Sequence, residues 1–555
     1  MRRLVWLTAL VILLLSLTAC TTSWQGEFGE GLSWSLDFLG NLRIEGQGAI
    51  PDYSMTDDEN PLDDEYNGSR PPWIMAERYI SSIEIGEGIT EIGDEAFALC
   101  MDVKSVSLPD SLTRIGWRSF LYCEKLKNIT FPDSLTGIGW YAFAGCSSLT
   151  EVRLPEQLTE LGPEAFRLCT KLRQIYLPEG ISADSFYGCV NLESIILAEA
   201  HTQLSVQDGV LFNHDKTELL RYPPGKKDTV YTVPDGVKIV GYASFSDADS
   251  LGKILLPDGV ETIDDYAFLN CSALRVLELP ASVTEVRDYA FSESGLVEII
   301  LPDHLTALGE GLFHECASLE RVQLPASLKT IPDNLFHSCS SLRKVEIPEN
   351  VEDIGVHSFA YCDELETLHI PAKAWVYEAA IHHCDNLQEI TVDEDSPYFY
   401  TIDGVLFGDG QSLGASGSTL LAYPAGKRDK MYSIPDGVVR LGEGAFAGTL
   451  YLEWITLPDL VRSLGPAVFL ESRRLTGATL GTGVTTLPAF FFEGCKHLKE
   501  IIVTDQLVTI EDDAFDEADS LRCITFAGTE EQWNAIEIRD GNEVLSDAEI
   551  IFGAN

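Results

Sequence analysis

Basic residues are scarce in this chain of 555 residues: 38 lysines and arginines stand against 87 aspartates and glutamates, for a formal net charge of −49. This shortage excludes a general nucleic-acid binder, because phosphate groups require a basic surface. It also excludes adsorption to anionic lipid through basic patches. The 13 cysteines are too few for a small disulfide scaffold, and their number is odd.

Catalytic signatures are missing as well. The chain has no Gly-x-x-x-x-Gly-Lys-Ser/Thr phosphate loop, no Gly-x-Gly-x-x-Gly dinucleotide turn and no Gly-x-Ser-x-Gly around a strand–helix elbow. Acidic residues are so frequent in this chain that a pair of carboxylates does not by itself indicate a catalytic site. We therefore predict a protein that is not an enzyme and that needs no cofactor.

The first 20 residues, MRRLVWLTALVILLLSLTAC, place two arginines before an apolar run and predict an export signal. The run is short for a helix that must span about 30 Å of hydrocarbon. Its end, Leu17-Thr18-Ala19-Cys20, resembles a bacterial lipobox. The resemblance implies a signal peptide over 1–19, a lipid anchor on Cys20, and a location at the outer face of the bacterial cell membrane or at the cell surface. No other stretch is expected to span a bilayer.

A period of 23 residues organises the middle of the chain. Residues 126–148, LKNITFPDSLTGIGWYAFAGCSS, form one unit. Ile129 and Phe131 alternate with polar residues, which predicts a short strand that Pro132 ends. A second apolar pattern from Ile138 to Phe143 is expected to turn the chain back over the same core. One unit cannot bury its own apolar face, so we expect stacked copies with strands about 4.8 Å apart.

The pattern Leu-x-x-Ile-x-Phe-Pro-x-x-Leu-x-x-Ile-Gly-x-x-Ala-Phe-x-x-Cys resembles the BspA-type leucine-rich repeats of bacterial surface proteins. It recurs from about residue 80 to 526. The resemblance implies a right-handed curved solenoid, mostly strand and loop, with a parallel β-sheet on its concave face. It also implies non-enzymatic recognition or adhesion, with an extracellular or envelope protein as the partner. Surface capture of a glycan or solute is the alternative, and an enzyme site on the insertions is the third hypothesis.

Segments outside the repeat define the expected domains. Insertions at about 198–232 and 393–433 read as strand, polar turn, strand and Pro-rich turn, which predicts two β-hairpin units stacked into or projecting from the solenoid. Residues 20–79 are expected to form a tether and a β-hairpin cap. The solenoid covers 80–526, and 527–555 form a C-terminal cap in which Trp533 covers the last coil.

The cysteines of the repeat invite a metal or disulfide interpretation. His314-x-Cys316 and His337-x-Cys339 lie one coil apart and have zinc-ligand types. However, the cysteines should face the core while the histidines face outward, and Ala, Ser or Thr replaces Cys in other coils. We therefore predict free buried thiols and no metal site. The acidic run 57–65 lacks the ligand spacing of a calcium loop and is interpreted as a solvated loop.

Partner binding is expected on the exposed side of the strands. Arg153, Tyr176 and Ile196 occupy one column on successive coils and should be neighbours. Arginine and tyrosine are favoured at the centres of protein interfaces. These three residues are the candidate partner-binding site, and an ordinary strand surface is the alternative interpretation.

Overall fold

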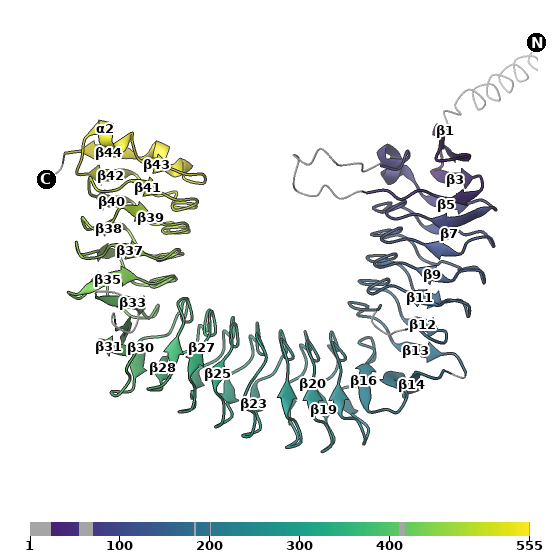
Figure 1. Cartoon of the computed structure of the whole chain (residues 1–555), viewed down its shortest axis with the longest axis horizontal. Helices are drawn as coiled ribbons and strands as arrows, with labels where there is room; N and C mark the ends of the chain where they lie inside the picture. The colour runs from purple at the N-terminus through teal and green to yellow at the C-terminus, as the bar shows by residue number, and fades with distance from the viewer. Residues whose placement is uncertain (1–23, 55–69, 182–184, 200, 410–416, 554–555) are drawn as a thin grey trace, which may run out of the picture. The chain divides into compact units, whose positions relative to one another are not determined.

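The structure, a computed structural model, describes residues 24–54, 70–181, 185–199, 201–409 and 417–553. The chain forms two compact units, which divide at the end of the first insertion. The first unit comprises the residues up to Asp228 together with Ala243–Ser250, and the second comprises Thr229–Tyr242 together with the residues from Leu251 onward. Each unit is built from short strands and loops stacked coil on coil (Figure 1). The parallel strand-and-loop solenoid that the repeat predicts is confirmed.

Most coils of the first unit contribute two short strands, and each strand joins its own row. The first row and the N-terminal cap contain β1 Trp24–Phe28, β2 Leu32–Leu36, β3 Asn41–Glu45, β5 Ser82–Ile85, β7 Ser105–Ser107, β10 Glu151–Arg153, β12 Gln174–Leu177 and β13 Ser194–Leu197. The second row contains β4 Gly48–Ala49, β6 Ile89–Ile92, β8 Arg114–Ile115, β9 Gly137–Ile138 and β11 Glu160–Leu161. The first insertion contains β14 Leu204–Gln207, β15 Val210–Asn213 and β16 Glu218–Arg221.

The second unit repeats this plan. Its first row contains β17 Val230–Thr232, β19 Lys253–Leu255, β21 Val276–Leu277, β23 Glu298–Ile300, β24 Arg321–Gln323, β26 Lys344–Val345, β28 Thr367–Ile370, β30 Glu389–Val392, β34 Met431–Ser433, β36 Trp454–Thr456, β38 Gly477–Thr479, β40 Glu500–Val503, β42 Cys523–Phe526 and β44 Glu549–Phe552. Its second row contains β18 Ile239–Val240, β20 Thr262–Ile263, β22 Glu285–Val286, β25 Thr330–Ile331, β27 Asp353–Ile354, β29 Trp375–Val376, β35 Val438–Leu441, β37 Ser463–Leu464, β39 Thr486–Leu487, β41 Thr509–Ile510 and β43 Glu537–Ile538. The second insertion contains β31 Phe399–Ile402, β32 Val405–Gly408 and β33 Ser418–Ala422.

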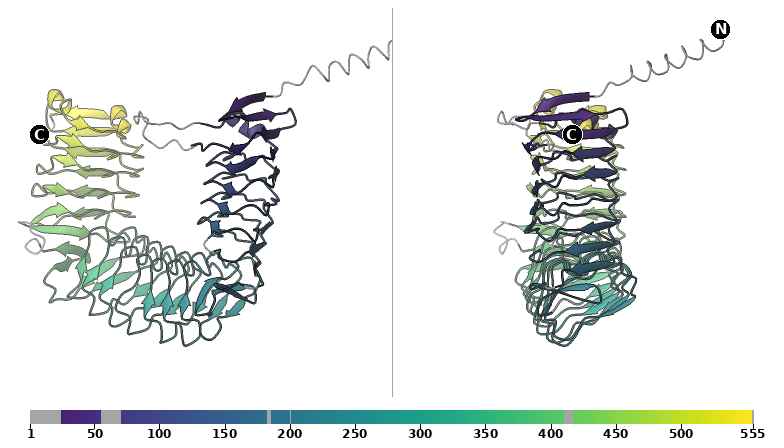
Figure 2. Two further views of the ribbon diagram at one scale, coloured as in Figure 1. Left: turned by 45° about the vertical axis from the view of Figure 1, so that its right-hand side comes forward. Right: turned by 90° about the vertical axis from the view of Figure 1, so that its right-hand side faces the viewer.

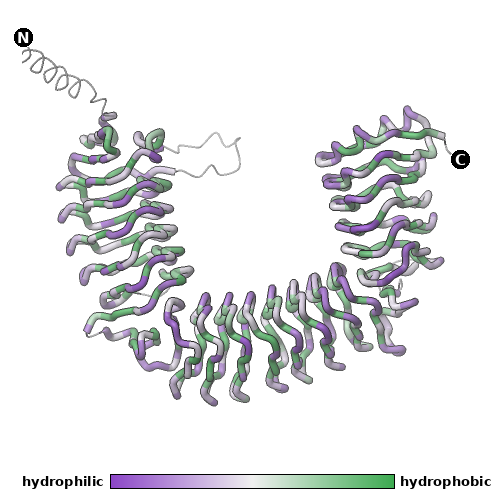
Figure 3. The backbone as a smooth tube through the Cα atoms, turned by 180° about the vertical axis from the view of Figure 1, so that it is seen from behind, coloured by the Kyte–Doolittle hydropathy of each residue, from purple (hydrophilic) through white to green (hydrophobic). Residues whose placement is uncertain are grey.

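The pairing register equals the sequence period. Ile115 lies beside Ile138, and Ile138 lies beside Leu161, so equivalent residues stack in columns. Coils approach closely at Gly139, where a β-carbon would lie 2.7 Å from the backbone of the preceding coil. Hydrophobic and hydrophilic stretches consequently alternate along every coil (Figure 3), and successive strands run alongside one another within each unit (Figure 2).

A column of stacked phenylalanine rings fills the core. The Phe120 and Phe143 rings lie 5.1 Å apart at 6°, and Phe143 and Phe166 lie 5.3 Å apart at 7°. All three side chains are fully buried. Non-glycine residues with positive φ flank the column, such as Tyr122 at 55° and Tyr141 at 53°, because the chain must turn sharply on both sides of each ring.

The insertions are stacked into the solenoid rather than projecting from it. In each of them a tyrosine takes the place of the column phenylalanine. Tyr222 stacks on Phe245 at 5.5 Å, and Tyr423 stacks on Phe446 at 5.1 Å. In the second insertion β33 pairs antiparallel with β32 and parallel with β35, so the hairpin continues the sheet of the coils that follow it.

Both ends of the stack are covered. At the start, β2 and β3 pair antiparallel, and β3 pairs parallel with β5. The 3-10 helix η1, Ile74–Tyr79, follows Trp73, whose buried ring stacks on Phe97 at 5.3 Å and begins the ring column. At the end, helix α2, Glu530–Trp533, places Trp533 5.4 Å from Phe526, and the 3-10 helix η2, Glu543–Asp547, precedes β44.

The described residues include no helix that combines the length and the apolar character needed to cross a bilayer.

Candidate functional site

The exposed side of the first strand row in the first unit carries the candidate site. Along β10 the side chains of Glu151 and Arg153 face solvent while Val152 lies in the core. The parallel register places Arg153 opposite Tyr176, and Tyr176 opposite Ile196. The structure therefore brings together the three residues that the column assignment selects.

Defined contacts hold the side chains of this trio in place. The guanidinium carbon of Arg153 lies 4.1 Å from the centre of the Tyr176 ring, which is a cation–π contact. The Tyr176 hydroxyl donates to Glu156 Oε1 at 2.6 Å, and this hydrogen bond raises the pKa of the tyrosine. Arg153 Nη2 lies 3.8 Å from the same carboxylate. Ile196 adds an apolar side chain that is 39% exposed.

Glu156 is the member of this cluster that sequence reasoning missed. It lies beyond Pro155, outside the alternating strand pattern, so no column position identifies it. With Glu156 the cluster presents a guanidinium, a ring, a carboxylate and an aliphatic group within one small area. Such mixed surfaces suit protein contacts, in which aromatic and arginine side chains supply most of the binding energy.

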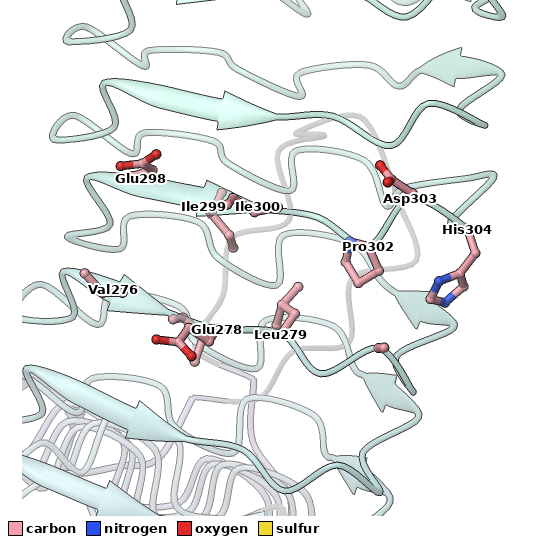
Figure 4. Close-up of a pocket in the computed structure, with 11 residues that line it drawn as sticks. Val276, Glu278, Leu279, Glu298, Ile299, Ile300, Pro302, Asp303 and His304 are labelled. Carbon is pink, nitrogen blue, oxygen red and sulfur yellow. The ribbon is translucent and has the colours of Figure 1, made fainter.

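A slot of about 640 Å³ opens on the second unit between β21 and β23 (Figure 4). These two strands share one residue pair, Val276 with Glu298, whereas β23 and β24 share three. Apolar groups of Val276 and Ile300, which are 47% and 58% exposed, line the slot. Leu279 and Pro302 extend this apolar lining.

Carboxylates surround the apolar lining of the slot. Glu278, Glu298 and Asp303 contribute to the wall, and Glu298 pairs with Arg321 at 2.9 Å. His304 Nε2 lies 2.7 Å from the Val283 carbonyl, and because a carbonyl only accepts, Nε2 is the donor. The slot can therefore receive an apolar side chain beside a cationic one.

The slot coincides with a shortened coil. Phe291 and Phe313 are 22 residues apart instead of 23, and the missing residue falls in the turn at Gly295. A β-carbon at Gly295 would lie 2.1 Å from the Ser272 carbonyl oxygen, so only glycine fits this turn. The broken period was the sequence signal for this site, but its effect on strand pairing required the structure.

The cysteine column makes a hydrogen bond that sequence reasoning did not foresee. The thiol of Cys123 donates to the Phe97 carbonyl of the preceding coil at 3.4 Å, and Cys146 donates likewise to Phe120 at 3.3 Å. The Ser472 hydroxyl makes the same contact with Phe446 at 3.0 Å, which explains why serine substitutes for cysteine. The described cysteines are free thiols, and burial raises the pKa of Cys495 to about 12, which disfavours a reactive thiolate.

The histidines beside this column face away from it. His314 and His337 stack ring on ring at 4.9 Å, while Cys316 and Cys339 donate from the core to the phenylalanine carbonyls behind them. Over the described ranges, histidine, cysteine, aspartate and glutamate side chains nowhere gather in a group of three that could hold a metal. Cys20 and the acidic run 57–65 lie outside the described residues.

The BspA-type leucine-rich repeat region, a family model of six copies, matches residues 79–214, 228–335, 265–388 and 429–535. These matches cover most of the chain, which therefore belongs to the BspA-type leucine-rich repeat family. Comparison with curated proteins found no match.

Solved structures of bacterial repeat proteins are similar to this chain. A leucine-rich repeat protein from Eubacterium ventriosum is 25% identical, with 68% of this chain and 93% of that chain covered and a TM-score of 0.52. A leucine-rich repeat protein from Bacteroides ovatus is 20% identical, with 91% and 98% covered and a TM-score of 0.33. A leucine-rich cell surface protein from Faecalibacterium prausnitzii is 19% identical, with 93% and 97% covered and a TM-score of 0.26. The first of these similarities supports the repeat fold.

Proposed function

We propose that this protein is an exported scaffold, anchored through lipid on Cys20, that recognises an extracellular or envelope protein without catalysis. Membership of a leucine-rich repeat family supports the binding role, since stacked coils provide an extended surface. The lipobox-like sequence Leu17-Thr18-Ala19-Cys20 supports the anchor. The net charge of −49 favours a partner with basic groups on its contact surface.

The Arg153–Tyr176 pair is the observation that carries this proposal. An arginine held 4.1 Å above a tyrosine ring, beside exposed Ile196, forms a compact and ordered contact surface. Both side chains are already restrained in the free protein by Glu156. Restraint before binding lowers the entropy that association must remove, which favours affinity.

Binding of a captured partner to charge-reversed protein tests this site. The partner is first captured by cross-linking on intact cells with the anchored protein, and its affinity is then measured for the Arg153→Glu, Tyr176→Ala double variant. We expect a loss of at least about 2 kcal/mol, roughly 30-fold in Kd, as for a hot-spot pair. The matched control is Lys125→Glu with Tyr122→Ala, which also reverses one positive charge and removes one tyrosine ring, at exposed turn positions of the same unit.

Equal affinity of both double variants would remove the trio as the binding site. Ile300→Glu then tests the slot of the second unit, with Leu255→Glu as its control, because both side chains are exposed in the first strand row of that unit but only Ile300 lines the slot. Capture of glycans on an array, without any protein partner, would instead support the alternative of glycan binding. Turnover in a hydrolase screen would contradict the non-catalytic role.

A further inference from the structure

Exposed apolar side chains gather at the N-terminal end of the first unit, in a surface that we call the end patch: Trp24, Phe38, Leu39, Met75 and Tyr79. Met75 is 85% exposed, Phe38 74%, Tyr79 72% and Leu39 65%. Of the five most exposed large apolar side chains that the structure describes, four are therefore in this patch. A patch of this kind on an otherwise acidic protein marks a contact surface.

The end patch is a built feature rather than a frayed end. The turn between β2 and β3 carries Phe38 and Leu39, and the Asp37 carboxylate accepts hydrogen bonds from the Leu39 and Asn41 amides at 2.8 and 2.9 Å. Gly40, at φ +83°, closes this turn against the Tyr79 carbonyl, where a β-carbon would lie at 2.2 Å. The turn therefore holds its two apolar side chains in a fixed outward direction.

The helix η1 contributes the other side of the end patch. Buried Trp73 fixes the start of η1, because its Nε1 donates to the Ala96 carbonyl at 2.9 Å and its ring stacks on Phe97. From that base η1 exposes Met75 and Tyr79. A hollow of about 380 Å³ separates Tyr79 from Trp24 and the Phe38 turn.

The short segment between Cys20 and Trp24 keeps the end patch close to the proposed lipid anchor. Four residue steps separate Cys20 from Trp24, and a fully extended chain spans at most about 3.6 Å per residue, or roughly 14 Å in total. A lipid-bearing Cys20 would thus keep Trp24, which opens β1, within about 14 Å of the anchored residue, a reach of roughly two headgroup layers. β1 is the outermost strand of its sheet, so no further coil of the described chain covers it (Figure 1).

We propose that the end patch docks on the bilayer that holds the Cys20 lipid, with Trp24, Phe38, Leu39 and Tyr79 at the level of the lipid headgroups. Tryptophan and tyrosine concentrate at membrane interfaces because their rings are apolar and their edges are polar. The contact needs no basic patch and is compatible with the acidic chain. Docking would seat the first coils against the membrane and fix the direction in which the solenoid leaves it. This inference rests on the proposed lipid anchor.

Photocross-linking of the full chain tests the docking. The protein, produced in a bacterium that acylates lipoproteins, carries benzoylphenylalanine in place of Phe38 and is reconstituted in vesicles of phosphatidylethanolamine and phosphatidylglycerol. The control carries the same probe in place of Trp140, a 56%-exposed ring on a later coil of the same unit. Burying one large apolar side chain favours a lipid contact by about tenfold or more. We therefore expect the yield of lipid adducts at residue 38 to exceed that at residue 140 by about tenfold.

A second probe, in place of Tyr79, keeps the test independent of the Phe38 substitution. Phe38→Asp with Leu39→Asp should lower lipid adducts at residue 79 by about tenfold. Mass spectrometry shows separately whether residue 20 carries lipid. Lipid on residue 20 without adducts at 38 and 79 would overturn docking and leave the anchor standing, whereas an unmodified residue 20 would overturn both. Adducts between two copies of residue 38, or only to another envelope protein, would replace the bilayer with that partner and overturn the proposal.

Discussion

Two rows of aromatic rings run through the same coils of the second unit, and they differ in burial and in the residue types they contain. The inner row, Phe291, Phe313 and Phe336, is fully buried, with ring centres 5.7 and 5.6 Å apart. The outer row lies on the turn side and is half-buried. It runs through Tyr266, Tyr289, His314, His337 and Tyr361, with ring centres 4.9 to 5.8 Å apart. The spacing is similar, but only the inner row keeps a single residue type.

The difference in residue type between the two rows follows from their difference in burial. A closed core accepts one ring shape in nearly one orientation, so phenylalanine recurs. The outer rings have edges in contact with water, so tyrosine and histidine both serve, and the angle between successive ring planes varies from 9° to 64°. The inner row therefore fixes the fold, while the outer row is free to vary.

The sharpest test of this contrast uses two adjacent residues, and the larger effect belongs to the inner row. Phe313→Ala should lower stability by about 3–5 kcal/mol, the usual cost of deleting a buried aromatic side chain. Hydrogen exchange of the amides in the neighbouring coils measures the loss locally, which suits a stack whose coils contact mainly their neighbours. A loss below about 1 kcal/mol would show that the ring is not essential to the core.

Low pH should lower the stability of the second unit, because two of its histidines are buried. Burial lowers the pKa of His382 to about 2 and of His383 to about 4, with His383 and Arg473 as the respective charged neighbours. Both imidazoles gain protons on unfolding below pH 6.5, so the free energy of unfolding falls as the pH falls. Burial, helped by Asp385, raises the pKa of Asp363 to about 6, which opposes one of the two histidines between pH 6 and 3.8. The net expectation is a loss of about 1.4 kcal/mol per pH unit from pH 6 to 4.5.

Denaturant unfolding over this pH range measures the slope. His382→Gln with His383→Gln should reverse its sign, because Asp363 alone then binds more protons in the folded chain, and Asp363→Asn should steepen it. Identical slopes in all three proteins would mean that these groups titrate alike in the folded and unfolded chains.

The outer row should yield a smaller effect at the next residue along the chain. His314→Ala removes a ring stacked between Tyr289 and His337, and aromatic pairs contribute about 0.5–1.5 kcal/mol beyond their buried area. We expect a loss of about 1 kcal/mol by the same exchange measurement, well below that of Phe313→Ala. An equal loss at both positions would erase the distinction between the two rows.

The turn that connects the rows should give the smallest change, and one of opposite sign. Glu293 is exposed, lies between the inner Phe291 and the turn at Gly295, and has φ +55°. Glycine adopts this conformation without steric cost, so Glu293→Gly should raise stability by about 0.5 kcal/mol after its greater freedom in the unfolded chain is included. Glu293→Ala retains the strain and is the control. Equal stability of the two variants would show that the turn is not strained.

The same contrast explains what the sequence could predict. The inner phenylalanines and the cysteines recur every 23 residues in most coils, so this period identified the coils, their parallel stacking and the adjacency of Arg153 and Tyr176. Ile196 follows a coil shortened to 20 residues, and Phe186 and Cys189 aligned it with the other two. The outer row shifts its position, since Tyr289 precedes Phe291 by two residues whereas His314 follows Phe313 by one. No periodic pattern reveals such a row, because it depends on where the turn places each side chain.

The remaining features depend on backbone geometry. The hydrogen bond from Cys123 to the Phe97 carbonyl joins residues 26 apart, which is the period plus the three residues that separate each phenylalanine from its cysteine. The slot at Ile300 arises from a single shortened turn, and Glu156 reaches Tyr176 from beyond the strand. Each requires the path of the chain between columns, which composition and spacing do not define.

One feature of the fold bears on how such a chain can evolve. Hydrogen bonds between coils join residues one period apart, as from the Thr159 hydroxyl to the Thr136 carbonyl and from the Thr136 hydroxyl to the Thr113 carbonyl. A coil therefore meets the same neighbours wherever it stands in the stack. Duplication or loss of one whole period in the gene would leave every remaining coil with suitable partners, so length can change in steps without redesign of the interior. Selection can then adjust the reach of the molecule in whole coils, and the strand-side residues can diversify from copy to copy.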